Sequence, residues 1–215
     1  MTLDALLQRA GVWRGGETSL RARHRPAQSI PTGLAPLDEQ LPGGGWPLGW
    51  LSEVLLPYHG IGELQLLLPV LAQLSQQERR ILFIAPPYIP YAPALWQQGV
   101  RLSHVLLIHT HKSQQQLWAM EQALRAGVCG AVLGWTHTPD PRVLRRLQLA
   151  AEAGHSAAIL FRPLRAHRHA SPAGLRIELT PDVNGTTVHI RKRRGGWHTR
   201  PVALRPAPRA CHAVA

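Results

Sequence analysis

The sequence contains few cysteines. Cys129 and Cys211 are the only two in 215 residues, the first in the apolar run "AGVCGAVLGW" and the second almost at the end of the chain. Small secreted domains typically carry several paired cysteines, and two thiols placed in this way do not form a disulfide framework. The cysteine content therefore argues against a disulfide-stabilised scaffold and fits a reducing, cytoplasmic setting.

Long apolar runs are also missing. The most apolar stretch, "LQLLLPVLAQL", spans residues 64–74, whereas a membrane-spanning helix needs about 20 apolar residues. The first residues, "MTLDALLQRAGVW", include an acid at position 4 and lack the apolar block of a signal peptide. We therefore expect a cytoplasmic protein without membrane contacts.

Acidic side chains are scarce: 12 Asp and Glu stand against 24 Lys and Arg, for a formal net charge of +12. Residues 31–160 carry eight basic and eight acidic side chains, so the whole excess of positive charge lies in the two flanking segments. Basic flanks on a neutral core are typical of a protein that meets nucleic acid or an acidic partner. The alternative is that the basic ends serve only solubility.

The middle of the chain alternates between short apolar runs and amphipathic stretches. With 45% apolar residues the chain can bury a sizeable core. Continuous apolar strands that alternate with helices predict an α/β fold with a mostly parallel sheet covered on both faces. We expect strands at residues 50–56, 79–87, 104–110, 131–135 and 156–163, and helices at 64–74, 94–100, 113–127 and 140–154.

The C-terminal part changes to strict alternation of apolar and polar residues. The segments 175–181 and 186–197 flank the turn sequence "DVNGT", which predicts an antiparallel hairpin at the edge of the sheet. We divide the chain into a helix with a basic linker (1–27), a core (28–163), a basic loop with the hairpin (164–205) and a disordered tail (206–215). The apolar stripe Leu3, Leu6 and Leu7 of the first segment is a candidate partner-binding helix.

The stretch "PYHGIGEL", residues 57–64, lies where a phosphate-binding loop is expected, between a strand and a helix. A working loop of this kind reads G-x-x-x-x-G-K-[ST], and its lysine and hydroxyl hold the phosphates and Mg²⁺. With Gly62 placed on the final glycine, Pro57 replaces the first glycine, Glu63 the lysine and Leu64 the hydroxyl residue; Gly60 is an additional glycine. An anion at the lysine position would repel a triphosphate.

Two further ATPase positions lack their chemistry. The strand "GAVLGW" ends in Gly134 and Trp135 rather than in a metal-binding Asp, and Pro86 and Pro87 follow "ILFIA" where a catalytic carboxylate is expected. We therefore predict a protein without catalytic residues, without enzymatic activity and without a cofactor.

Two other groups of residues are candidates for a binding site. A basic segment near the C-terminus is a candidate for contact with DNA or an acidic partner; it comprises Arg191, Lys192, Arg193, Arg194, Trp197 and Arg200. The alternative is a charged edge strand that resists aggregation. Histidines occur at alternate positions in "HTH" and "HRH", but no carboxylate or cysteine completes a set, so we expect no metal site.

The stretch "TGLAPLDEQLPGGGWPLGWLSEVL" resembles the region just before the phosphate-binding loop of RecA-type recombinases. The residues that carry the resemblance are Thr32, Gly33, Leu37, Asp38, Gly43 to Gly45, Pro47, Gly49 and Glu53. With its degenerate loop, its length and its basic "RKRRGGW", the chain is similar over roughly residues 28–205 to ImuA, a family of RecA-like accessory proteins of bacterial translesion synthesis.

The resemblance implies a RecA-like core and a non-catalytic role in the SOS response. A member of this family would bridge RecA on DNA and a complex of an ImuB-like protein with an error-prone polymerase, with single-stranded DNA and self-association as further expectations. ImuA proteins share ancestry with SulA, an SOS-induced inhibitor that binds the division protein FtsZ, so a division inhibitor is the alternative. A residual nucleotide-binding enzyme is the third candidate, and the degenerate loop argues against it.

Overall fold

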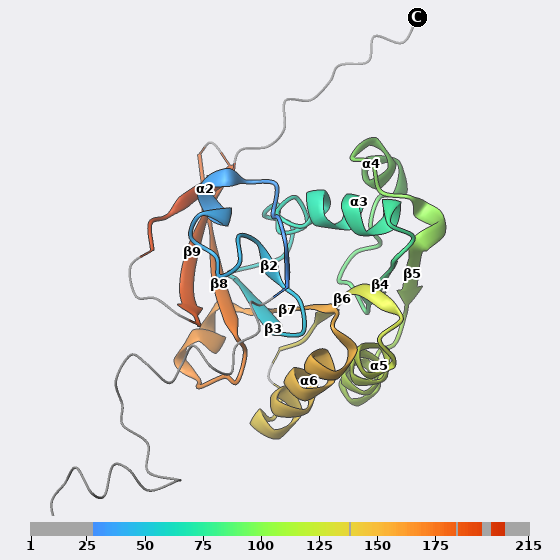
Figure 1. Ribbon diagram of the computed structural model, residues 1–215. Coiled ribbons are helices and arrows are strands. Elements are labelled where there is room, and N and C mark those ends of the chain that lie inside the picture. Colours follow the sequence, from blue (N-terminus) through green and yellow to red (C-terminus); the bar gives the residue numbers. More distant parts are fainter. Residues whose placement is uncertain (1–27, 138, 184, 195–198, 205–215) are drawn as a thin grey trace, which may run out of the picture.

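The computed structural model describes residues 28–137, 139–183, 185–194 and 199–204. In this part of the chain, a large mixed sheet has the strand order β10-β9-β8-β3-β7-β6-β4-β5 and is flanked by helices (Figure 1). Its strands are β3 (Leu51–Leu56), β4 (Arg80–Ile84), β5 (Val105–Ile108), β6 (Cys129–Trp135), β7 (Ala157–Pro163), β8 (Leu175–Asp182), β9 (Gly185–Arg193) and β10 (Val202–Leu204). The fold is mixed α/β, as the alternation of apolar and amphipathic segments predicted.

Six neighbouring strands of the sheet are parallel, from β8 through β3 to β5. The antiparallel hairpin of β8 and β9 continues the sheet beside β3, and β10 pairs with β9. The hairpin was expected to form the edge of the sheet, but β10 pairs along its outer strand. The edge prediction is therefore wrong in detail, because a third C-terminal strand follows the hairpin.

Helices cover both faces of the sheet (Figure 1). On one side lie α2 (Ala35–Asp38), α3 (Leu68–Gln76) and α4 (Ala92–Gln97); on the other lie α5 (Ser113–Ala126) and α6 (Pro141–Gly154). Short 3₁₀ turns, η1 (Leu102–His104) and η2 (Leu164–Arg168), lead into β5 and follow β7.

Two hydrophobic clusters correspond to these two faces. The larger contains Val54 of β3, Leu71 of α3 and Phe161 of β7, and the smaller contains Leu124 of α5 and Leu147 of α6. Strands β3, β4, β6 and β7 contribute residues to both clusters, as strands covered on both faces do, whereas β8, β9 and β10 contribute only to the larger cluster.

Helix α3 begins later than predicted. The expected helix over 64–74 is observed as Leu68–Gln76, and residues 63–67 form turns instead. Pro69 explains the difference, because proline lacks an N–H and is tolerated only in the first turn of a helix. The shift matters for the site, since it leaves the segment between β3 and α3 as a loop.

The residues that resemble the RecA entry region build a small structural unit. Strands β1 (Ser29–Ile30) and β2 (Trp46–Pro47) pair with each other, and the Thr32 backbone N–H donates to the Asp38 carboxylate at 2.8 Å. A Cβ on Gly45 would lie 2.1 Å from the carbonyl oxygen of Ile30, so a close approach of the backbone requires glycine there. These motif residues therefore fix the entry to β3.

Candidate functional site

The loop between β3 and α3 lies at the carboxyl end of the central strand. Ligands of open α/β sheets bind at this end, where connections leave to opposite sides, and β3 has β7 on one side and β8 on the other. Gly60 and Gly62 have φ of +90° and +95°, a region that glycine adopts without strain. Pro57 is exposed, whereas Leu64 is partly buried against the larger cluster.

Glu63 closes this loop from within. The backbone N–H of Gly60 donates to both carboxylate oxygens of Glu63, at 3.0 and 3.1 Å, and the residue is buried. A phosphate-binding loop holds an anion with its backbone amides. Here the protein's own carboxylate accepts the hydrogen bond of a loop amide. Glu63 therefore stands where a lysine was expected, and it is itself the anion that the loop amide contacts.

The two other positions expected of an ATPase are occupied by apolar structure. Trp135 at the end of β6 is stacked on Phe161 with ring centroids 4.6 Å apart, and on Phe83 at 6.2 Å. Pro86 and Pro87 follow β4 and line a cleft. The carboxyl edge thus presents aromatic rings and prolines instead of carboxylates.

This cleft, of about 230 Å³, lies between the loop and the segment that follows β4. Its lining includes Gly60, Gly62, Glu63, Leu64, Gln65, Pro86, Pro87, Tyr88, Ile89, Pro90, Tyr91 and Trp135. Tyr88, Ile89 and Tyr91 are exposed to 70%, 75% and 72%, and Tyr58 in the loop and Trp96 on α4 are also exposed. We call these five residues the aromatic edge.

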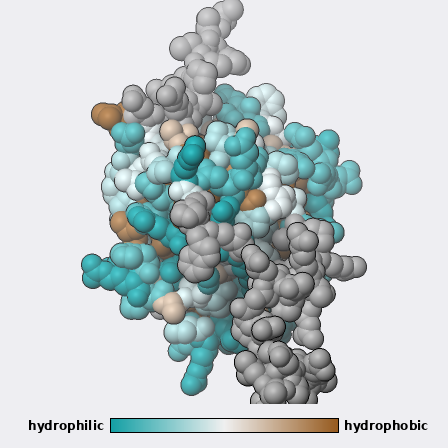
Figure 2. Space-filling view, turned by 60° about the vertical axis from the view of Figure 1, so that its left-hand side comes forward, coloured by the Kyte–Doolittle hydropathy of each residue, from teal (hydrophilic) through white to brown (hydrophobic). Residues whose placement is uncertain are grey.

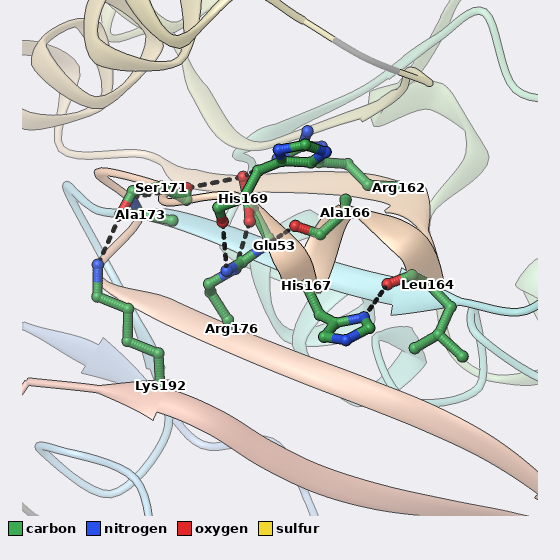
Figure 3. A network of polar contacts seen from close by, with 10 residues as sticks. All are labelled: Glu53, Arg162, Leu164, Ala166, His167, His169, Ser171, Ala173, Arg176 and Lys192. Atoms are coloured by element: carbon green, nitrogen blue, oxygen red, sulfur yellow. Dashed lines mark hydrogen bonds and ion pairs between the residues drawn. The ribbon is translucent and has the colours of Figure 1, made fainter.

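A buried charge network lies beneath the segment that follows β7 (Figure 3). Glu53 is fully buried in β3, and its carboxylate pairs with Arg162 of β7 and Arg176 of β8, both at 2.7 Å. Ser171 Oγ also donates to Glu53, at 2.8 Å. Because buried charges must be paired and hydrogen-bonded, this network links three strands to one loop.

Arg176 extends the network to the turn η2. Its terminal nitrogens donate to the carbonyl oxygens of Ala166 at 2.7 Å and His169 at 3.1 Å (Figure 3). The sequence analysis identified Glu53 only through the resemblance and did not identify Arg162 or Arg176. The available signal for Arg162 was a charged residue in an otherwise apolar strand, whereas Arg176 lies in a strand of alternating apolar and polar residues and gave no such signal.

The structure separates the cations of the basic segment. Arg191 donates through Nε to Glu178 at 2.6 Å, and the Lys192 ammonium donates to the carbonyl oxygen of Ser171 at 2.7 Å. Arg193 donates to the carbonyl oxygen of Gln40, and Arg194 lies 4.6 Å from the ring centroid of Trp50. The backbone N–H of Arg200 donates to the Gln40 side chain. These residues therefore do not form one continuous phosphate-binding row.

Three pKa values in this region are displaced. The hydrogen bond from Arg191 lowers the pKa of Glu178, although partial burial of Glu178 opposes the shift, and the same bond raises the pKa of Arg191. Burial lowers the pKa of Lys192, and the charge of Arg176 lowers it further.

Some candidate residues lie outside the part of the chain that the structure describes. These are Leu3, Leu6 and Leu7 of the expected N-terminal helix, Trp197 of the basic segment, and the tail 206–215. Among the described residues, no three His, Cys, Asp or Glu side chains come together in a way that could hold a metal ion. None of the described helices is long and apolar enough to cross a membrane.

The fold and site define a mixed α/β protein in which a buried glutamate closes the loop that follows the central strand β3. The family model of the cell division inhibitor SulA matches residues 49–158. Cell division inhibitors SulA of Yersinia pestis (strain Pestoides F) and Yersinia pseudotuberculosis (strain IP 31758) are each 33% identical over 148 residues, covering 68% of this chain and 85% of the relative. The chain belongs to the SulA family.

A solved structure is also similar. The crystal structure of SulA from Pseudomonas aeruginosa is 27% identical, with a TM-score of 0.44, and the match covers 52% of this chain and 97% of that one.

These matches correct the function expected from the sequence. The prediction of an adaptor for translesion synthesis, with an ImuB-like protein and RecA as partners, is wrong, because the relatives are cell division inhibitors. Two features had misled the prediction. The RecA-type motif fixes the entry to β3, and the basic segment, which suggested DNA, makes several contacts within the molecule.

Proposed function

We propose that this protein is a cell-division inhibitor that binds the division protein FtsZ as part of the SOS response. The observation that carries the proposal is membership of the SulA family, shown by the family model and by relatives whose length the match covers to 85%. FtsZ is the partner that the sequence resemblance to SulA already named as the alternative.

The aromatic edge is the surface that we assign to this partner. Tyr88, Ile89, Tyr91 and Trp96 lie within nine residues of the chain and are all largely exposed. Monomeric proteins rarely expose contiguous apolar side chains without a binding function. Tyrosine and tryptophan are also the side chains that most often dominate the energy of protein interfaces. The adjacent cleft of about 230 Å³ offers a recess for one side chain of the partner.

The core is, in our proposal, a RecA-like fold that carries no nucleotide chemistry. In support, the degenerate loop follows the central strand β3, and Glu63 occupies the Gly60 amide that would otherwise face a phosphate. Trp135 and the two prolines stand at the expected carboxylate positions. A titration with a fluorescent ATP analogue in the presence of Mg²⁺ should give no saturable binding, and measurable turnover would refute this part of the proposal.

The test of the main proposal is binding to purified FtsZ and inhibition of its GTP-dependent polymerisation, measured by sedimentation. We expect the full-length protein to bind FtsZ and to lower the polymer yield. Trp96→Ala, and the double variant Tyr88→Ser with Tyr91→Ser, should weaken binding by at least about tenfold, since interface aromatics contribute about 2 kcal/mol or more.

The chain offers a matched control. Trp118 lies on α5 and is 61% exposed, against 69% for Trp96 on α4. Trp118→Ala should leave FtsZ binding unchanged. Absence of FtsZ binding by the unaltered protein would refute the function, and an equal loss from both tryptophan variants would refute the assignment of the surface.

A further inference from the structure

A second cleft is lined by residues of η2, β8 and β9. It has a volume of about 390 Å³ and is lined by Leu164, His167, Arg176, Glu178, Arg191 and Lys192. Clefts of about 300–1,000 Å³ suit small ligands. It shares no lining residue with the cleft at the aromatic edge. Hydrophilic residues predominate on the side of the molecule that Figure 2 turns forward, where β9 lies in Figure 1.

The strand pleat explains why these side chains meet. Arg176 and Glu178 are two residues apart on β8, so both point to the same face. An irregularity in the pairing of β8 with β9 sets Ile177 opposite Ile190 and Arg176 opposite Lys192, which leaves Arg191 as the extra residue. A bulge of this kind redirects side chains. It brings two consecutive cations, Arg191 and Lys192, to the cleft.

The charge of the lining is strongly positive. Three cations, Arg176, Arg191 and Lys192, stand against the single carboxylate of Glu178, which gives +2 with histidine neutral. The pair of Glu53 and Arg162 behind the cleft adds one charge of each sign and leaves this value unchanged. The pKa of Lys192 is lowered by burial and by the charge of Arg176, so an anion placed here would relieve repulsion between cations.

The hydrogen bonds already made show which donors remain for a ligand. The Arg176 guanidinium forms an ion pair with Glu53 through Nε and donates from its terminal nitrogens to His169 and Ala166, so it supplies chiefly charge and a fixed wall. Lys192 makes one hydrogen bond, to Ser171, and an ammonium has three protons.

Arg191 completes the set of donors, and His167 adds an acceptor. Arg191 uses Nε on Glu178 and keeps its two terminal nitrogens for a ligand. His167 Nδ1 lies 2.9 Å from the carbonyl oxygen of Leu164, which can only accept, so Nδ1 carries the proton (Figure 3). In the neutral imidazole Nε2 is then an acceptor, and it can meet a phosphate only through a hydroxyl of that phosphate.

We propose that this cleft binds a small molecule bearing a phosphate monoester, held by Lys192 and Arg191 with His167 at its side. A phosphate monoester carries a charge of about −1.5 to −2 at pH 7, which matches the lining, whereas a single carboxylate would leave it half neutralised. Among the residues that the structure describes, no Phe, Tyr or Trp lines the cleft, so this part of the chain offers no large stacking platform of the kind by which proteins bind unpaired bases. The ligand is therefore recognised by its phosphate.

The experiment is a calorimetric titration of the full-length protein with inorganic phosphate and with phenyl phosphate, at constant ionic strength. We expect saturable binding of both, and binding of acetate at least about tenfold weaker. Lys192→Gln and Arg191→Gln should each weaken phosphate binding by at least about tenfold. Lys112→Gln is the matched control, because Lys112 is exposed beside α5, and it should have no effect. Thermal unfolding curves of the variants verify that each is folded.

Four results would overturn the proposal: no saturable phosphate binding, equal affinity for acetate, an unchanged affinity in both cleft variants, or preference for a hexaglutamate peptide over phosphate. The last would make the cleft a surface for acidic polypeptides. FtsZ binding by Lys192→Gln is expected to equal that of the unaltered protein, so failure of this inference and failure of the proposed function can be distinguished.

Discussion

Both carboxylate oxygens of Glu63 accept the backbone N–H of Gly60, three residues earlier in the same loop. A sequence comparison with a working phosphate loop registers this residue only as a lost lysine. In the folded molecule it is the anion that the loop holds. The loop is therefore held from within by the contact between Gly60 and Glu63.

Replacing Glu63 by alanine should destabilise the protein without creating a nucleotide site. Hydrogen bonds to charged groups contribute about 1.5–3 kcal/mol, and Gly60 is exposed enough for water to replace part of this. We expect a loss of about 1–2 kcal/mol in the free energy of unfolding, measured by urea denaturation. Glu39→Ala, at an exposed site, should change it by less than about 0.5 kcal/mol. An equal loss from both variants would contradict the role of Glu63.

Removing the carboxylate of Glu53 should lower the free energy of unfolding far more than removing that of Glu63. Glu53→Ala removes the shared partner of Arg162 and Arg176, which are 3% and 9% exposed in their side chains. Breaking a buried ion pair by removing one partner typically costs about 3–5 kcal/mol, because the remaining charge is uncompensated. We therefore expect Glu53→Ala to lower the urea midpoint severely or to prevent folding.

A surface pair provides the comparison for this prediction. Arg191 is 53% exposed, whereas the Glu178 side chain is 12% exposed. Because solvent screens the Arg191 end of the pair, we expect a contribution of about 1 kcal/mol, the upper end of the range for exposed pairs. Arg191→Gln should accordingly leave the protein folded with a small loss of stability. Similar urea midpoints for Glu53→Ala and Arg191→Gln would show that the buried network contributes little.

The sequence predicted the alternation of strands and helices well, because apolar runs and amphipathic periods are local properties. The strands β3, β4, β6 and β7 and the helices α5 and α6 lie where their residues indicated. Helix α3 differed through one residue, Pro69, whose effect is also local. Each of these features can be read from a short window of sequence.

The site could be predicted only in part, because it depends on contacts between distant residues. Glu53 and Arg162 lie 109 positions apart and meet only through the strand order. The basic segment looked like one surface, yet Arg193 reaches Gln40 and Lys192 reaches Ser171. The residues that carry the resemblance to RecA-type proteins shape the entry to β3, but residues that shape the backbone do not determine which partner is bound.

The pair of Arg191 and Glu178 should make stability depend on pH in the acid range. Its hydrogen bond lowers the pKa of Glu178 below the usual 4.5. A carboxyl group with a depressed pKa in the folded state stabilises the protein above its unfolded pKa, and this contribution is lost as the pH falls through the folded value.

Urea midpoints of the unaltered protein and of Arg191→Gln are the measurement for this prediction. They should differ at pH 7 and converge as the pH is lowered through and below about 4.5. A difference that persists undiminished at pH 3 would show that Arg191 contributes through packing rather than through the charge of Glu178.

Cys129 should be chemically inert in the folded protein. It is the first residue of β6 and is 3% exposed, and burial raises the pKa of its thiol despite the nearby charges of Arg80 and Arg79. Its carbonyl oxygen accepts hydrogen bonds from Ser156 at 2.6 Å and from Arg79 at 3.2 Å, which tie down the start of the strand. The thiolate is the reactive form, so both the raised pKa and the lack of access slow its chemistry.

The reaction of Cys129 with a thiol reagent at pH 8 is best followed in the Cys211→Ser variant, where it is the only cysteine. We expect labelling at least about tenfold slower in buffer than in 6 M guanidinium chloride, because burial both raises the pKa of the Cys129 thiol and keeps the reagent away from it. Addition of urea below the unfolding midpoint tests the strand itself. If labelling accelerates only with global unfolding, β6 opens as part of the whole sheet; acceleration well below the midpoint would show that this end of β6 opens locally.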